Sequence, residues 1–313
     1  MANKISLNKD KTELIIFQSN KPPPILKIKL NGKCLSPSKM VKYLGIYLDE
    51  TLSGEAHTVE LIKKLNRANG MLAKIRHFVP ENISVQIYHS IFASHLTYGC
   101  QVWSQKLCSV RNQVSVLQKN AIRLITFSHH KAPSEPLFKN LGILKFEDIL
   151  FQHNCLFVHD FLKGNLPLSF NDTFKRINEK HTIKTRNANI GMLSTERYHG
   201  VTFGNKSIYA NCIKSWNKFT LINNEKDKII DLIMFSRNKL KSLIKDFFMN
   251  KYETYIPADW FQTNCFVSQT LEENGNFKIT ISKCHTFRTT EALNEGFLFK
   301  ICWGDPLKFL TNN

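Results

Sequence analysis

Basic side chains are the residues of this sequence most able to hold a ligand. The chain has 43 Lys+Arg against 25 Asp+Glu, which gives a formal net charge of +18. Such a surplus favours polyanionic partners, because each Lys or Arg set against a phosphate releases condensed counterions. A Lys-rich proteome is the alternative explanation, since Asn, Lys, Ile and Phe are all abundant. Five basic residues fall within one short segment, at Lys63, Lys64, Arg67, Lys74 and Arg76.

Residue combinations typical of catalysis or metal binding are missing from the sequence. It contains no G-x-x-x-x-G-K-[ST], G-x-S-x-G or H-E-x-x-H. The eight cysteines form no C-x-x-C pair, and His129-His130, beside Lys131 in an expected loop, has no Cys or carboxylate at ligand spacing. We therefore expect no metal site and no small-molecule substrate.

The N-terminus has no signal peptide, and no apolar run approaches the ~18 residues that a membrane helix needs. The cysteines are expected to be free and reduced. Together these features predict an intracellular protein, nuclear or cytoplasmic, without a membrane partner.

The hydrophobic pattern predicts that the basic segment is a helix over 57–77. Apolar residues recur there at steps of three and four, which draws one stripe along a helix. The stripe consists of Val59, Ile62, Leu65, Ala68, Leu72, Ile75 and Phe78. We expect Ile62, Leu65, Leu72 and Ile75 to face a core shared with a second helix over 81–103. The basic residues fall largely outside the stripe, and a solvated helix face is the usual place for such a run.

The remaining pattern predicts an α+β fold that is mainly α, with a short antiparallel element before residue 50. Strands are expected over 13–17, 25–30 and 41–48, with Asn31-Gly32 as a hairpin turn. Further helices are expected over 110–127, 134–140, 146–163, 206–219 and 227–250, with a long loop over 164–205. Tyr98 and Trp103 are expected to be core aromatics.

Three segments, in this order, carry a resemblance to a known family. The first runs from Asn3 to Thr12 and leads into the strand ending at Phe17. The second is Val41 to Asp49, which reads V-K-Y-L-G-I-Y-L-D. The third begins at His57 and ends in L-T-Y-G-C-Q-V-W at Trp103. Their order and spacing resemble the end of the palm, the primer grip and the thumb of non-LTR retrotransposon reverse transcriptases.

The resemblance implies a role for several residues. Lys11 matches the lysine beside the incoming nucleotide, where a cation offsets charge on the pyrophosphate side. The primer-grip-like turn is Tyr43, Leu44 and Gly45, and glycine suits a close approach of backbone to a primer end. The thumb-like helix would lie against template–primer duplex, RNA–DNA or DNA, and its five basic residues would be phosphate contacts that read no sequence.

The same resemblance divides the chain. Residues 1–52 would be a palm remnant with primer-grip-like strands, 53–130 a thumb-like helical bundle and 131–252 a downstream helical region. Residues 253–313 hold five Lys+Arg and seven Asp+Glu, so the basic surplus lies wholly in residues 1–252. Gln118 to Arg123 and Ser215 to Asn217 fit the region downstream of the thumb, and the resemblance ends near Tyr252. We therefore expect 253–313 to be a divergent tail outside the compact unit.

The residues that would perform nucleotidyl transfer are absent. The family holds two Mg²⁺ ions on palm aspartates, one motif being [FY]-x-D-D, and the ions clamp the attacking and leaving oxygens. No Asp-Asp dipeptide occurs here. The chain therefore resembles a truncated RNA-directed DNA polymerase that carries no cofactor, binds duplex at most and is inactive alone. The alternative is a co-opted or inert helical protein whose partner is another protein, and steep salt dependence of duplex binding would separate the two.

Overall fold

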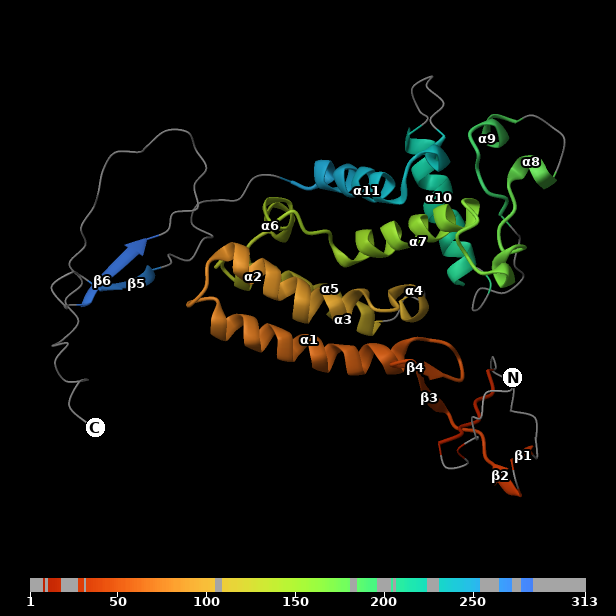
Figure 1. Cartoon of the computed structure of the whole chain (residues 1–313), viewed down its shortest axis with the longest axis horizontal. Coiled ribbons are helices and arrows are strands. Elements are labelled where there is room, and N and C mark those ends of the chain that lie inside the picture. The colour runs from red at the N-terminus through yellow and green to blue at the C-terminus, as the bar shows by residue number, and fades with distance from the viewer. Residues whose placement is uncertain are drawn as a thin grey trace. The chain divides into compact units, whose positions relative to one another are not determined.

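The computed structural model describes residues 8, 11–17, 28–30, 32–104, 109–180, 185–195, 204, 207–223, 231–253, 265–271 and 277–283. The chain divides into two compact units, Met1–Gln262 and Thr263–Asn313. Small antiparallel strand pairs precede a series of helices in the first unit (Figure 1). The prediction of an α+β, mainly helical fold is confirmed, while the four predicted domains stay predictions.

Two short hairpins begin the described part of the first unit. Strand β1 (Ile28–Leu30) pairs with β2 (Lys33–Leu35), and β3 (Met40–Tyr43) pairs with β4 (Ile46–Asp49), both antiparallel. The single strand expected over 41–48 is thus wrong, because Leu44 and Gly45 adopt φ of 45° and 82°. Two successive left-handed residues are the geometry of a tight hairpin turn, which reverses the chain.

The N-terminal predictions hold only in part. Instead of a strand over 13–17, the structure has a single bridge from Leu14 to Pro37, with Ser38 N donating to Leu14 O at 2.7 Å. Gly32 turns the chain between β1 and β2 with φ of 84°. Asn31, the other half of that expected turn, lies outside the described residues.

Helix α1 (Glu55–Ile75) confirms the helix predicted from the basic segment. Leu65 and Leu72 are buried, and Ile62 and Ile75 pack half-buried against the same cluster as Phe92 and Leu96 of the 81–103 region. The ends of the predicted stripe are wrong, since Val59 is 42% exposed and Phe78 is 85% exposed. Leu61, which the stripe omitted, is buried in their place.

The helix expected over 81–103 is interrupted. It comprises α2 (Glu81–Ile87), a π-helical segment η1 (Tyr88–Ala93), α3 (Ser94–Thr97) and α4 (Cys100–Trp103). Tyr98 is extended and Gly99 has φ of 55°. A left-handed glycine ends one helix and redirects the chain into the next.

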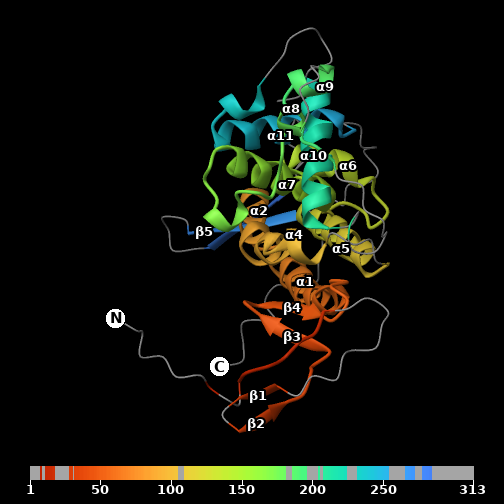
Figure 2. The same ribbon diagram turned by 90° about the vertical axis from the view of Figure 1, so that its right-hand side faces the viewer.

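Helix α5 (Ser109–Ile125) lies beside α1, as Figures 1 and 2 show, and Asn69 Nδ2 of α1 donates to Leu117 O of α5 at 3.0 Å. Helices α6 (Ser134–Asn140) and α7 (Phe146–Leu162) follow close to their predicted bounds. Gln118 of α5 joins these parts: its Nε2 donates to Tyr88 Oη and Leu144 O, both at 3.0 Å, and its Oε1 accepts from Phe146 N at 2.8 Å.

The later helices surround a second hydrophobic cluster that includes Trp216, Phe219 and Ile244. The expected loop over 164–205 contains short helical turns, at η2 (Leu168–Phe170), α8 (Ile177–Lys180) and α9 (Arg186–Asn189). Helix α10 (Ile208–Asn223) matches its prediction. Of the helix expected over 227–250, residues 227–230 lie outside the described residues, and the rest is interrupted, with η3 (Leu232–Met234) followed by α11 (Arg237–Lys251).

The second unit contains one described hairpin, in which β5 (Cys265–Leu271) pairs antiparallel with β6 (Phe277–Lys283). The sequence has weak strand-like patches over 277–281 and 297–303. The first falls within β6, and the second lies outside the described residues. A search of the described helices finds none with the length and apolar character needed to cross a membrane. The described cysteines Cys34, Cys100, Cys155 and Cys212 are free, as expected.

Candidate nucleic-acid interface

The β3–β4 turn is held from outside the hairpin. Tyr43 and Leu44 are 63% and 72% exposed, so the turn presents its side chains to solvent. Tyr98 Oη donates to Leu44 O at 2.6 Å, and a Cβ on Gly45 would lie 3.5 Å from the Tyr98 ring. Tyr98 is itself 54% exposed, so the expectation of a core aromatic was wrong for this residue. Its hydroxyl and ring fix the position of the turn.

The loop between β4 and α1 is organised by Asp49. Its carboxylate accepts hydrogen bonds from the backbone N–H groups of Thr51, Ser53 and Gly54, and from the hydroxyls of Thr51 and Ser53, at 2.6–3.1 Å. Partial burial by itself would raise the pKa of Asp49, but these hydrogen bonds outweigh it and lower the pKa below its ordinary value. The carboxylate therefore stays ionised and keeps the loop closed.

Gly54 brings this loop against α4. It has φ of 76° and is buried, and a Cβ at this position would lie 1.9 Å from Trp103 O. The Trp103 ring stacks on Phe146 of α7, with centroids 5.3 Å apart and an interplanar angle of 4°. Trp103 is thus a core residue, as expected, and the hairpin is docked on the helical core through its backbone.

A hollow of about 310 Å³ lies where the hairpin meets α1 and α3. Gly45 and Lys64, from the predicted turn and the predicted basic face, both line it. The other lining residues are Tyr47, His57, Glu60, Leu61, Ser94, His95 and Tyr98. The structure therefore brings two sets of sequence-predicted residues to one concave surface.

His57 forms the inner wall of this hollow. Its side chain is buried, and its Nδ1 accepts from Tyr47 N at 3.4 Å. Burial, and then the charge of Lys64, lowers the pKa of His57 to about 4. The imidazole is therefore neutral at physiological pH, and Lys64 is the basic group of this hollow, which the carboxylate of Glu60 also lines.

Four of the five predicted phosphate contacts lie on one face of α1. At 3.6 residues per turn, Lys63, Lys64, Arg67 and Lys74 fall within an arc of about 100°, and all four are exposed. Lys63 also forms an exposed ion pair with Glu60, Nζ to Oε1 at 2.6 Å. We call these four residues the basic stripe.

Arg76 lies apart from the basic stripe. It falls on the side of the helix that carries Leu65 and Leu72, and it is half-buried. Its guanidinium carbon lies 4.6 Å from the centroid of the Phe127 ring. Lys11 is also apart, since it is exposed, lies outside the hollow and has its backbone N 3.3 Å from Asn8 Oδ1.

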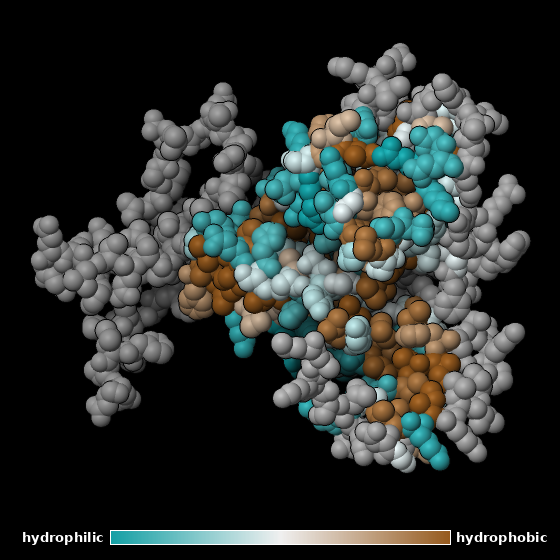
Figure 3. Space-filling model, turned by 45° about the vertical axis from the view of Figure 1, so that its right-hand side comes forward, coloured by the Kyte–Doolittle hydropathy of each residue, from teal (hydrophilic) through white to brown (hydrophobic). Residues whose placement is uncertain are grey.

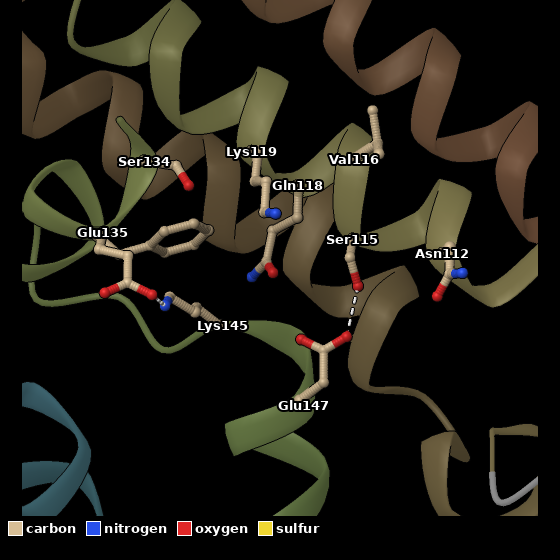
Figure 4. A pocket seen from close by; sticks show the side chains of 10 residues that line it. Asn112, Ser115, Val116, Gln118, Lys119, Ser134, Glu135, Lys145 and Glu147 are labelled. Carbon is tan, nitrogen blue, oxygen red and sulfur yellow. Dashed lines mark hydrogen bonds and ion pairs between the residues drawn. The ribbon is translucent and has the colours of Figure 1, made fainter. Parts of the chain in front are cut away.

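A second hollow, of about 350 Å³, is formed by α5, α6 and the start of α7 (Figure 4). None of the predicted site residues lines it. Glu135 forms an ion pair with Lys145, and Ser115 Oγ donates to Glu147 Oε1 at 2.6 Å. Its two lysines are matched by two carboxylates, so it offers no net charge to a polyanion.

No Mg²⁺ site is formed by the described part of the chain. Nowhere among those residues do three His, Cys, Asp or Glu side chains come together in a way that could hold a metal ion. The described carboxylates thus do not form the two-metal centre that the family resemblance implies.

Tyr98 is the residue that sequence reasoning missed. An aromatic in an apolar stretch usually predicts a core position, and the hydrophobic pattern carried no sign of the hydrogen bond to Leu44. The signal was the neighbouring Gly99, because a glycine inside an otherwise helical pattern marks a possible break.

The chain is similar to three kinds of retrotransposon polymerase. It is 27% identical over 150 residues to the RNA-directed DNA polymerase from mobile element jockey of Drosophila melanogaster, covering 47% of this chain and 16% of the polymerase. It is 27% identical over 142 residues to the probable RNA-directed DNA polymerase from transposon BS of the same fly, covering 42% of this chain and 15% of that polymerase. It is 26% identical over 131 residues to the retrovirus-related Pol polyprotein from type-1 retrotransposable element R1 of Bradysia coprophila, covering 40% of this chain and 12% of the polyprotein.

The resemblance to non-LTR retrotransposon RNA-directed DNA polymerases is therefore confirmed. The matched part of the chain spans only 12–16% of the length of these relatives. No family model matches the chain, and no solved structure matches it.

Proposed function

We propose that this chain supplies the duplex-holding part of a non-LTR retrotransposon reverse transcriptase. In this proposal the basic stripe of α1 lies along the phosphate backbone of a template–primer duplex, and the β3–β4 turn meets the primer end. The observation that supports it is the shared hollow: Gly45 of the turn and Lys64 of the stripe line the same concave surface. One ligand entering it would meet both.

The dimensions of the basic stripe fit a nucleic-acid backbone. Lys63 and Lys74 are eleven residues apart, about 16 Å along a helix at 1.5 Å per residue. One strand of a duplex carries a phosphate roughly every 3.4 Å of axis, so the stripe spans about five phosphates. Lysine and arginine contacts of this kind position a duplex and carry no sequence information. We expect binding with little sequence preference, to RNA–DNA and DNA duplexes alike.

We further propose that the chain by itself does not extend a primer. Nucleotidyl transfer needs carboxylates that hold two metal ions about the reacting phosphate. The 313 residues contain no Asp-Asp pair, and the described carboxylates form no cluster that fits a metal. The role of the chain's own residues is to bind and orient the duplex. Purified protein given Mg²⁺, deoxynucleotides and a primed RNA template should show no extension.

Salt-dependent binding tests the duplex contact. If the four residues of the stripe reach phosphates, log affinity against log salt should have a slope of about −4. Replacing Lys63, Lys64 and Arg67 together with Ala should flatten the slope by up to about three units, roughly one for each true contact. The matched control replaces Lys239, Lys241 and Lys245, three exposed lysines of α11. A slope left unchanged by the α1 triple variant, or changed equally by the control, would contradict the assignment.

A protein partner is the second candidate, and the hairpin surface favours it. Met40, Tyr43, Leu44 and Tyr98 are 48%, 63%, 72% and 54% exposed. Figure 3 shows hydrophobic residues gathered at the lower right of the face it presents, the end of the molecule that carries the β3–β4 hairpin in Figures 1 and 2. Exposed apolar groups gathered in this way mark interaction surfaces. A duplex affinity that is weak and nearly independent of salt would favour this candidate over the first.

A further inference from the structure

The C-terminal ends of α1 and α5 lie together, far along α1 from the hollow. The two helices run in the same direction: Asn69 meets Leu117 near their middles, and His77 meets Phe127 just beyond their ends. His57 and His77 are twenty residues apart, which is about 30 Å at 1.5 Å per residue. Whatever binds at this end is therefore separate from a ligand in the hollow.

Basic groups converge on this end from both helices. The Arg76 guanidinium lies over the Phe127 ring, and the His77 ring meets the same ring edge-on with centroids 5.3 Å apart. The loop after α5 adds His129, His130 and Lys131, with the two histidine rings 4.1 Å apart. Helix C-termini attract cations through the helix dipole. That attraction accounts for Arg76 but not for the loop residues beyond the helix.

Arg123 builds the loop that carries these residues. Its Nε and Nη2 both donate to Ala132 O, at 3.0 and 2.9 Å, and Ser128 N donates to Arg123 O at 3.0 Å. Phe127 turns the chain with φ of 51°. The loop is thus folded back on α5, which leaves His130 and Lys131 exposed at its tip.

The charges around His130 are all of one sign. Partial desolvation, and then the positive charges of His129, Lys131 and Arg123, lower the pKa of His130. No ion pair to a carboxylate engages Arg76, His130 or Lys131 within the part of the chain that the structure describes. A lowered pKa favours the neutral form of His130, so the positive charge of this surface comes from Arg76, Arg123 and Lys131, and it complements an anion.

Phe78 stands next to this positive surface. It follows His77 directly, and its backbone N donates to Ile75 O at 2.9 Å, which fixes it at the end of α1. Its side chain is 85% exposed, the largest exposed fraction of any large hydrophobic side chain that the structure describes. An isolated exposed phenylalanine contributes little to folding, but it offers a flat face to an unpaired base.

We propose that this end of α1 and α5 binds single-stranded nucleic acid, with Phe78 stacking on a base and Arg76, His130 and Lys131 contacting the neighbouring phosphates. Aromatic rings interleaved with cations are the arrangement that binds unpaired strands without sequence preference. A duplex keeps its bases stacked inside and would leave Phe78 unused. The ligand is thus an unpaired strand, of RNA or DNA, and the surface acts beside the duplex contact proposed above and does not depend on it.

Fluorescence anisotropy with the full chain tests this proposal. The probes are labelled oligo(dT) and oligo(U) of about a dozen nucleotides, a length within the range of single-strand binding sites, and a blunt duplex hairpin. Phe78→Ala should weaken binding of the single strands by about 5- to 150-fold, the range measured when one stacking aromatic is removed. Duplex binding should change by less than about twofold. Phe78→Trp should restore single-strand binding, and the matched control Leu168→Ala, at a side chain 84% exposed, should leave it unchanged.

Each result of the anisotropy measurements either supports or overturns the single-strand proposal. Equal loss with oligo(dT) and oligo(U) supports an unpaired strand of either sugar, and loss with one alone assigns the sugar. Single-strand binding that survives Phe78→Ala, or a loss that is equal for duplex and single strand, would overturn the proposal. Loss of duplex binding alone in the α1 triple variant concerns only the proposed function, so the two proposals fail separately.

Discussion

Substituting Gly54 is expected to separate the hairpin from the helical core. Its φ of 76° costs a residue with a Cβ roughly 1–2 kcal/mol. In addition, the Cβ would lie 1.9 Å from Trp103 O, whereas non-bonded heavy atoms sit at about 3.5 Å. The atom in the way is backbone, so no rotamer change relieves the contact and the loop must move. Forced overpacking of this kind costs typically ~1–3 kcal/mol, which gives a total of roughly 2–5 kcal/mol for Gly54→Ala.

Gly164→Ala is the matched control. Gly164 has φ of 71°, and a Cβ there meets nothing within 4 Å, so that variant carries the backbone cost without the clash. The gain from a less flexible unfolded chain, about 0.4–1 kcal/mol, is common to both variants and cancels in the comparison. Urea unfolding followed by far-ultraviolet circular dichroism gives both free energies of unfolding. If the two variants lose the same stability to within about 0.5 kcal/mol, the docking of Gly54 on Trp103 is not as described.

Two further predictions concern the walls of the hollow. Tyr98→Phe removes the donor to Leu44 O and should lower the free energy of unfolding by about 0.5–1.5 kcal/mol. The control Tyr43→Phe, at a 63% exposed residue of the same turn, should leave the free energy of unfolding unchanged in the same urea titration. Equal losses in the two variants would contradict the anchoring role of Tyr98. His57 has a pKa of about 4 in the folded chain and 6.5 ordinarily, so between these pH values the unfolded chain binds more protons than the folded chain. The contribution of His57 to stability is therefore complete above about pH 6.5 and is lost as the pH falls towards 4. Unfolding midpoints at pH 7 and pH 5 should therefore differ less in His57→Gln than in the unsubstituted chain, and an unchanged difference would show that another group titrates.

Hydrophobic periodicity predicted the helices whose apolar residues repeat regularly along one face. The stripe through Leu65 and Leu72 gave α1 and its buried face, because a helix packed on one side repeats every 3.6 residues. The same rule failed at the ends. Val59 and Phe78 continue the spacing but are exposed, since a periodic pattern does not show where the neighbouring helices stop covering it.

Breaks within elements were harder to predict because their causes lie elsewhere in the fold. The turn at Leu44 and Gly45 was expected from the family resemblance alone, because the hydrophobic pattern there predicts one strand, and Gly99 interrupts what the pattern predicts as one helix. A Cβ at Gly99 would lie 2.3 Å from Ile46 Cδ1, so the need for a residue without a side chain there comes from a residue more than fifty positions away. Local propensity carries no information about such a contact.

The candidate site was predictable as a set of residues but not as a surface. The lysines of α1 were identified from charge and spacing, and helical geometry alone places Lys63, Lys64, Arg67 and Lys74 on one face. The same geometry separates Arg76 from them, but it does not show that Arg76 packs on Phe127 beyond the end of another helix. Lys11 was assigned by resemblance only, and the structure does not bring it to the hollow.

The two motifs that carried the resemblance, one around Gly45 and one ending at Trp103, form one contact unit. Tyr98 of the second motif donates to Leu44 of the first, and Gly99 of the second packs on Ile46 of the first. The loop that follows the first motif then presses Gly54 against the backbone of Trp103. Each motif therefore packs against the other and holds it in place. A substitution in either motif should move the β3–β4 turn relative to Lys64. It follows that both motifs together build the hollow, and that its shape depends on Gly54 and Gly99, which do not line it.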